Sequence, residues 1–166
     1  MSAEDLVIGP WGARFRGRWF PCAVGRGGIG EKRAEGDGVT PVGRHRIEWV
    51  YVRPDRVWLY SPLQRRAIGH RDAWSDDPAD PNYNAPVQRP RRLSHEAMRR
   101  PDGLYDIVAV LDWNRAPVKP GRGSAIFLHV WRAPRRPTEG CVAFRRRDLM
   151  WILEHWRRGG RVVIRA

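Results

Sequence analysis

Short apolar runs recur along the chain between glycines, prolines and charged residues, and this pattern predicts a fold built mainly from strands. The most continuously apolar runs, 105–111 and 125–128, predict the central strands of a sheet. Other expected strands cover 6–8, 13–15, 19–24, 44–52, 57–60 and 161–164.

One helix is expected near the C-terminal end, because apolar residues recur there at helical spacing. They are Leu149, Ile152, Leu153 and Trp156. Asp148 stands near its start and Gly159-Gly160 after its end, as helix termini favour. Its apolar face should pack behind the loop around position 141. A shorter helix is expected over 94–99, ended by Pro101.

Segment 25–41 is rich in glycine, and segment 72–90 is rich in proline and aspartate. Both compositions predict long irregular loops. A chain of 166 residues suffices for one domain with its own core. We therefore expect a single domain over residues 1–166, mainly β with one or two helices.

The chain is strongly basic, with 31 Lys and Arg against 18 Asp and Glu and a net charge of +13. Such a surface attracts polyanions, either nucleic acid or an acidic cell-wall polymer that carries carboxylates. A nucleic-acid-binding module therefore stays open as an alternative, although no helix-turn-helix, zinc-finger spacing or RNA-binding aromatic motif supports it.

Two cysteines are too few for a disulfide scaffold or a four-cysteine zinc site. Asp76, Asp77 and Asp80 suit turns and caps better than an EF-hand loop, since Pro78 and Pro81 interrupt them. We expect neither a metal nor a cofactor. No run reaches the length of a transmembrane segment, and the first residues show no secretory signal.

The apolar run 125–128 leads into His129, and one loop later Gly140 precedes Cys141. A thiolate is the reactive form of cysteine, and a nearby imidazole favours it. Glycine lets the backbone approach a substrate closely. We therefore expect Cys141 as a nucleophile, His129 as its base, and the N–H groups of Gly140 and Cys141 as donors to an oxyanion.

The structural alternative is that Cys141 is a small buried apolar residue, as most free cysteines are, and that His129 merely ends a strand. The polar, turn-forming sequence at 137–142 and the pairing of the two residues across one loop favour catalysis instead. Cys22, in a strand-like run, is expected to be structural.

Residues 123–129 followed by Thr138-Glu139-Gly140-Cys141-Val142 resemble the signature of the L,D-transpeptidase (YkuD) family. The segment Thr40-Pro41-Val42-Gly43 resembles the family's Thr-Pro-x-Gly motif. The resemblance covers most of the chain and implies a YkuD-like β-sandwich or open-barrel catalytic domain. It also implies peptidoglycan stem peptides as the partner, a location in the periplasm or cell envelope, and inhibition by carbapenems.

The resemblance implies an acyl transfer in which Cys141 forms a thioester with a donor stem peptide and an acceptor amine then resolves it. The cross-link would join two diaminopimelate residues, or L-alanine to diaminopimelate. A peptidoglycan endopeptidase or carboxypeptidase of the same fold, with water as the acceptor, stays open. Two positions depart from the family pattern: Glu139 replaces a common histidine and Ala143 a common arginine. We expect a monomer.

Further residues are expected to contact substrate. Thr138 and Glu139 flank the thiol, Arg132 offers a guanidinium to carboxylates, and Trp131 is expected to wall the cleft. In the segment 72–90, Trp74 is expected to stack on a sugar or peptide. Tyr83 and Asn84, from the same segment, resemble residues of a branch of the family that lacks accessory domains.

Overall fold

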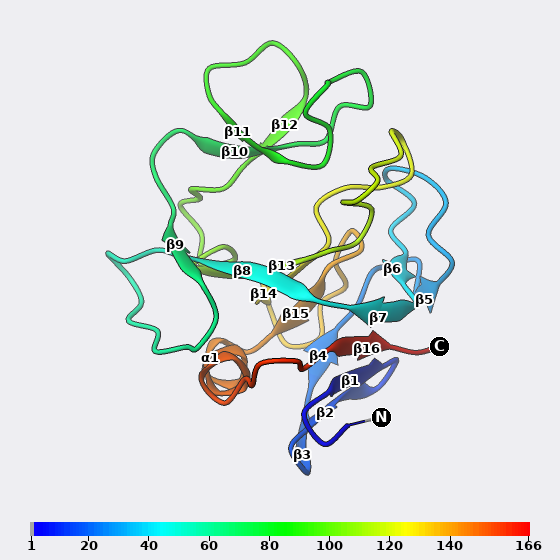
Figure 1. Ribbon diagram of the computed structural model, residues 1–166, viewed down its shortest axis with the longest axis vertical. Coiled ribbons are helices and arrows are strands. Elements are labelled where there is room, and N and C mark those ends of the chain that lie inside the picture. The colour runs from blue at the N-terminus through cyan, green and yellow to red at the C-terminus, as the bar shows by residue number, and fades with distance from the viewer. Residues whose placement is uncertain (1) are drawn as a thin grey trace.

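A six-stranded sheet occupies the centre of the fold (Figure 1). The computed structural model describes residues 2–166. In order across the sheet, the strands are β4 (Cys22–Ala23), β15 (Val142–Phe144), β14 (Phe127–Val130), β13 (Ile107–Leu111), β8 (Ile47–Val52) and β9 (Arg65–Ala67). The two runs predicted to be central strands are β13 and β14, so that prediction is confirmed.

A five-stranded sheet brings the two ends of the chain together (Figure 1). Its order is β3 (Arg18–Phe20), β2 (Gly12–Phe15), β1 (Leu6–Gly9), β16 (Val162–Ile164) and β7 (Gly43–His45). The expected strands 19–24 and 44–52 are each divided between this sheet and the six-stranded one. Pro21 divides the first of these, between β3 and β4, because proline has no backbone N–H to donate to a neighbouring strand.

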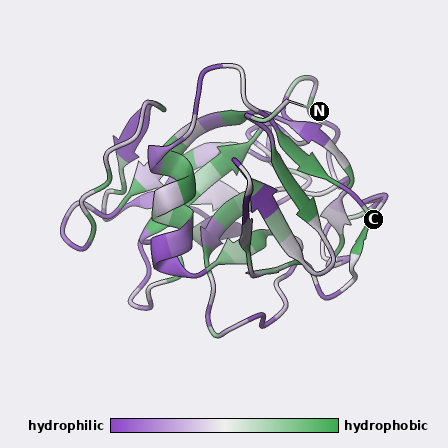
Figure 2. Cartoon of the chain, turned by 90° about the horizontal axis from the view of Figure 1, so that it is seen from below, coloured by the Kyte–Doolittle hydropathy of each residue, from purple (hydrophilic) through white to green (hydrophobic). Residues whose placement is uncertain are grey.

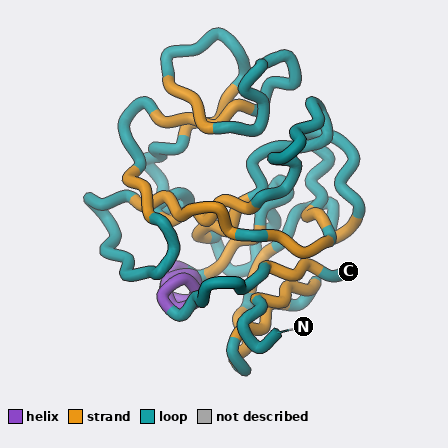
Figure 3. The backbone as a smooth tube through the Cα atoms, in the orientation of Figure 1, coloured by secondary structure: helices purple, strands orange, loops and turns teal. Residues whose placement is uncertain are grey.

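A three-stranded sheet forms the upper part of Figure 1, with β10 (Asp72–Ser75) between β11 (Pro86–Gln88) and β12 (His95–Ala97). The expected helix over 94–99 is wrong, because β12 pairs antiparallel with β10. The expected loop over 72–90 is wrong in part for the same reason. Figure 3 shows how much loop remains around these strands. The other segment, 25–41, is mostly loop, with β5 (Ile29–Gly30) and β6 (Thr40–Pro41).

The expected strand at 57–60 is also wrong. Val57 and Leu59 are buried, whereas Trp58 and Tyr60 are exposed, so the alternation typical of a strand is present. The segment nevertheless pairs with no strand of the described chain. Alternation records which side chains are buried, and an extended loop lying over a core produces the same pattern.

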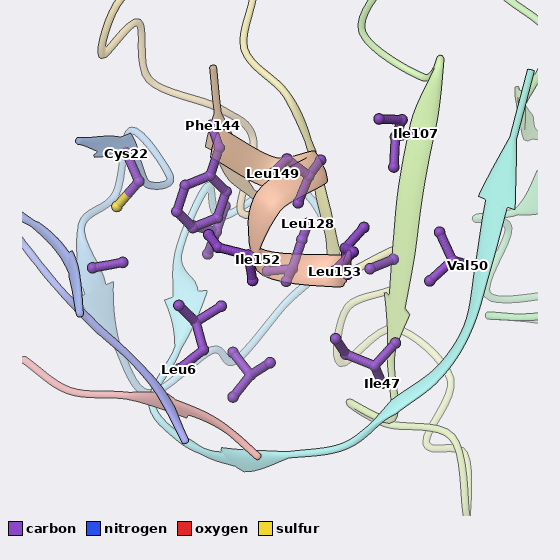
Figure 4. Packing of buried hydrophobic residues seen from close by; sticks show 14 of the residues in the cluster. Leu6, Cys22, Ile47, Val50, Ile107, Leu128, Phe144, Leu149, Ile152 and Leu153 are labelled. Carbon is purple, nitrogen blue, oxygen red and sulfur yellow. The ribbon is translucent and has the colours of Figure 1, made fainter. Parts of the chain in front are cut away.

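The single helix described, α1 (Arg146–Glu154), buries Leu149, Ile152 and Leu153 against Leu128 and Phe144 of the six-stranded sheet (Figure 4). Figure 2 shows that α1 carries both hydrophobic and hydrophilic residues, as a helix that covers one face of a sheet does. No helix within residues 2–166 is long and apolar enough to cross a membrane.

Successive side chains of a strand point to opposite faces, so the six-stranded sheet separates two apolar clusters. Leu128, Val142 and Phe144 belong to the cluster beneath α1. Phe127 belongs to the other cluster, on which Cys141 packs. The helix thus lies behind the cysteine loop, as predicted, and the thiol faces the opposite side.

Candidate active site

Cys141 and His129 lie on the same face of the six-stranded sheet. β14 and β15 run parallel, with His129 paired to Ala143, which places Cys141 level with Phe127. Residues two apart on a strand point to the same face. Both side chains line one cavity of about 830 Å³. The predicted catalytic pair is therefore brought to one cavity, although its members sit on diagonal positions of neighbouring strands.

The thiol of Cys141 is partly buried and is held by the backbone. Sγ donates to the carbonyl oxygen of Ala125 at 3.1 Å and accepts from the N–H of Phe127 at 3.4 Å. Burial, together with the carboxylate of Glu96, raises the pKa of the Cys141 thiol to about 12. Within residues 2–166, no hydrogen bond joins this sulfur to the imidazole of His129.

His129 is only 5% exposed, and its ring orientation is fixed by the backbone. Nδ1 lies 2.8 Å from the carbonyl oxygen of Val130. Because a carbonyl can only accept, Nδ1 carries the proton and Nε2 presents a lone pair. The ring of Tyr105 packs edge-on at 5.4 Å between centroids. Burial lowers the pKa of His129 to about 4, so the imidazole is neutral at pH 7.

A neutral thiol and a neutral imidazole define one kind of chemistry. A preformed thiolate–imidazolium pair would need a low thiol pKa and a high imidazole pKa, and burial produces the reverse for Cys141 and His129. The arrangement suits general-base catalysis, in which Nε2 takes the proton while the sulfur attacks. Catalytic hydrogen bonds are often absent before substrate binds.

Thr138 closes the turn that carries the thiol. Its hydroxyl donates to the carbonyl oxygen of Cys141 at 2.6 Å and accepts from the N–H of Gly140 at 3.1 Å. The expectation that Gly140 donates to an oxyanion is therefore wrong in this conformation, since that N–H is already engaged. Of the two expected N–H groups, that of Cys141 therefore remains as the donor to an oxyanion.

The Thr-Pro-x-Gly segment supports the turn from beneath. The hydroxyl of Thr40 donates to the carbonyl oxygen of Gly140 at 2.9 Å and accepts from the N–H of Gly25 at 2.8 Å. Gly140 has φ of +138°, and a Cβ there would lie 3.0 Å from the carbonyl oxygen of Val39. Glycine is required at this position for both reasons.

A buried cation lies beside the same turn. Lys32 is 2% exposed, and its Nζ contacts Asp37 Oδ1 at 2.6 Å. A Cβ placed on Gly140 would lie 3.5 Å from that Nζ. The charge of Lys32 opposes the rise in the Cys141 pKa. Sequence reasoning missed Lys32, since a lysine in a glycine-rich segment normally indicates exposed loop.

The segment 72–90 supports the site and does not offer the expected contacts. Trp74 is 1% exposed and packs on Phe127 at 5.0 Å between ring centroids, so the expected stacking on substrate is wrong. Asn84 is also buried. Its Oδ1 accepts from Trp74 Nε1 and from the N–H of Ala125, both at 3.0 Å. Asn84 therefore positions Ala125, whose carbonyl holds the thiol.

Tyr83 is likewise buried, and its hydroxyl accepts from the N–H of Gly123 at 3.0 Å and donates to Glu35. The expectation that Tyr83 contacts substrate is therefore wrong, because its hydroxyl is occupied by partners within the protein. Trp131 lies outside the cavity lining, with the guanidinium of Arg145 over its ring, so the expectation that it walls the cleft is wrong.

The cavity lining includes the predicted Arg132, Thr138 and Glu139. Glu139 pairs with Arg26 at 2.8 Å across an exposed contact. Arg136, from the loop between His129 and Cys141, lines it as well. The lining also contains polar residues that the sequence did not place there: Glu35, Asp76, Glu96, Arg100 and Ser124. Glu35 comes from the glycine-rich loop, Glu96 from β12, and Asp76 and Arg100 from the segments that follow β10 and β12. The sequence pattern did not bring these segments near Cys141.

The sequence profile of the L,D-transpeptidase catalytic domain (YkuD) matches residues 14–164. This match covers nearly the whole chain, which belongs to that family of enzymes acting on peptidoglycan. The mainly β fold with one helix agrees with the family. A comparison with curated proteins and one with solved structures each gave no match.

Proposed function

We propose that this protein is a peptidoglycan L,D-transpeptidase that joins stem peptides through a thioester on Cys141. The observation that carries the proposal is that His129, oriented by the carbonyl oxygen of Val130, and Cys141 line one cavity from one face of the sheet. The cross-link is of the diaminopimelate–diaminopimelate or the L-alanine–diaminopimelate type.

In the first step, Nε2 of His129 takes the thiol proton while Sγ of Cys141 attacks a donor carbonyl. The N–H of Cys141 stabilises the oxyanion that forms. The imidazolium then returns the proton to the departing amine, and the D-amino acid leaves. In the second step, an acceptor amine loses a proton to His129 and attacks the thioester, which releases the thiol and leaves a new amide bond.

The electrostatics favour such a substrate. Arg132 and Arg136 line the cavity, and a guanidinium binds carboxylates with two parallel hydrogen bonds. The net charge of +13 also draws the chain toward an acidic polymer. We also propose that the protein acts in the cell envelope and that it is a monomer with a single domain.

The test uses purified protein and a monomeric tetrapeptide muropeptide, with products identified by mass spectrometry. We expect a cross-linked dimer, the released D-amino acid, and a thioester on the intact protein. Cys141→Ala should give none of these, whereas Cys22→Ala should give all three. Product formation by Cys141→Ala would overturn the proposal, and a trimmed monomer in place of the dimer would indicate a hydrolase.

A further inference from the structure

Three carboxylates line one wall of the cavity. Glu35 comes from the glycine-rich loop, Asp76 follows β10, and Glu96 lies within β12. They lie within electrostatic reach of one another: burial raises the pKa of Glu96, and the charges of Asp76 and Glu35 add to that rise. An acidic wall in a chain with so large an excess of arginine requires an explanation.

Little positive charge compensates this wall. Arg100 Nη1 lies 3.9 Å from Glu96, but its Nε and Nη2 donate to Asp102 at 2.9 and 2.8 Å. Glu96 and Glu35 instead accept from the hydroxyls of Tyr105 and Tyr83, which are neutral. Arg132 and Arg136 also line the cavity, but within residues 2–166 Arg100 is the one guanidinium that forms an ion pair with any of the three carboxylates.

The same wall carries polar atoms that have no partner. Oδ1 of Asp76 is buried and accepts no hydrogen bond within residues 2–166. Ser124 is 6% exposed, and its Oγ is also without a partner in that part of the chain. Both residues line the cavity. The hydroxyl of Ser124 stands beside the Tyr83–Glu35 pair, near enough to influence the pKa of Tyr83. A buried acceptor left unpaired is destabilising, because the hydrogen bonds it made to water are lost and not replaced.

The group that would satisfy this wall must carry positive charge and several donors. No group of three His, Cys, Asp or Glu side chains in residues 2–166 converges tightly enough to hold a metal ion. A primary ammonium has one charge and three N–H donors. We propose that Glu35, Asp76, Glu96 and Ser124 bind a primary ammonium group of the stem-peptide substrate, an inference that rests on the proposed function.

Such an ammonium has two possible sources. It is either the side-chain amine of the donor, held while Cys141 attacks, or the amine of the acceptor, held before it loses a proton and attacks the thioester. Both ammonium groups would be recognised by the same contacts. Acylation of Cys141 depends on the donor and transfer from the thioester depends on the acceptor, so the two half-reactions can be measured separately to distinguish them.

The first arm measures acylation of Cys141 by mass spectrometry, using a donor tetrapeptide muropeptide with a free side-chain amine and the same donor with that amine acetylated. The second arm starts from protein acylated by the acetylated donor and follows transfer to a free-amine acceptor over a range of concentrations. Each arm uses the wild type, Asp76→Asn and Glu35→Gln. Glu31→Gln is the control, because Glu31 is exposed, pairs with Arg33 and lies outside the cavity lining.

We expect Asp76→Asn and Glu35→Gln each to lose about tenfold or more, either of the preference for the free-amine donor in the first arm or of the transfer rate at low acceptor concentration in the second. A change in the first arm would identify the bound ammonium as the donor's, and a change in the second as the acceptor's. Glu31→Gln should match the wild type in both arms. Glu35 is exposed, so Glu35→Gln tests the inference even if Asp76→Asn folds poorly. If the wild type is acylated, and Glu35→Gln keeps both the full donor preference in the first arm and the wild-type transfer rate in the second, the inference fails and the proposed function stands. If the wild type forms no thioester, both fail.

Discussion

The thiol of Cys141 donates to the carbonyl oxygen of Ala125 at 3.1 Å, and Ala125 is a non-glycine residue with φ of +53°. A side chain makes this left-handed conformation unfavourable by about 1 kcal/mol or more. Asn84 holds it there through the N–H of Ala125. The position of Cys141 therefore depends on a buried amide from the turn between β10 and β11.

The first prediction concerns Asn84. Asn84→Ala removes hydrogen bonds to Trp74 and Ala125 and to the carbonyl oxygens of Trp113 and Asn114. We expect a loss of about 3 kcal/mol in the free energy of unfolding, measured with urea. We also expect slower acylation of Cys141, since Ala125 is freed.

Asn82→Ala is the matched control for this prediction. Asn82 is exposed, and its side chain makes one long contact, at 3.5 Å, to Asp80. It should unfold within about 0.5 kcal/mol of the wild type. If Asn84→Ala were acylated at the wild-type rate, Asn84 would have no part in positioning the thiol.

The second prediction concerns the pH dependence of acylation. The pKa of His129 is lowered to about 4 and that of Cys141 is raised to about 12. The neutral base is therefore present across the neutral range, and the acylation rate should be flat from about pH 6 to 9, falling only as His129 is protonated near pH 4. The rate is measured from the mass of the thioester over time.

His129→Gln is the informative variant for that profile. Without the base, the rate depends on the thiolate fraction and should rise about tenfold per pH unit. At pH 7 it should be about 10²–10⁴-fold below the wild type. A wild-type profile that rises with pH in the same manner would exclude His129 as the base.

The third prediction concerns stability. His129 binds its proton near pH 4 when folded and near pH 6.5 when unfolded. Between these values the unfolded chain binds more protons, so stability is complete above pH 6.5 and declines as pH falls toward 4. The contribution is about 3 kcal/mol. Urea unfolding from pH 4.5 to 7.5 should therefore show a steeper decline for the wild type than for His129→Gln. Parallel curves would show that His129 is not buried as a neutral ring.

The fourth prediction concerns Gly140. Gly140→Ala places a Cβ at φ of +138° and 3.0 Å from the carbonyl oxygen of Val39, so it should lower both stability and acylation. Gly17→Ala is the control, because Gly17 has φ of +76° and a Cβ there would meet no atom of the described residues within 4 Å. It should lose about 1 kcal/mol and retain activity. Equal losses in the two variants would show that the contact with Val39 has no effect.

The fifth prediction separates the two thiols. Cys22 is 4% exposed and lies in the core beneath α1, whereas Cys141 lines the cavity. A carbapenem should therefore add to Cys141 alone, and Cys141→Ala should show no added mass while Cys22→Ala still does. An adduct on Cys22 in folded protein would contradict the assignment of the nucleophile.

The sequence by itself determined the central strands and the helix, and it singled out His129 and Cys141 as the candidate pair. The runs that became β13 and β14 are buried on both faces, so their apolar character needs no knowledge of their neighbours. Residue type, a glycine and one intervening loop single out His129 and Cys141 as a proposed base and nucleophile, and the fold brings both to one cavity.

Only the tertiary structure decided what surrounds that pair. Trp74 and Asn84 look like exposed loop residues in a segment rich in proline and aspartate, yet both are buried. Trp74 packs on Trp49 and Phe127, and Asn84 accepts a hydrogen bond from Ala125, all from segments distant in sequence. The state of the thiol, its hold on Ala125 and the acidic wall of the cavity arise from contacts between segments distant in sequence. A periodic pattern reports the burial of a side chain, whereas the identity of its neighbours depends on how the sheets pack.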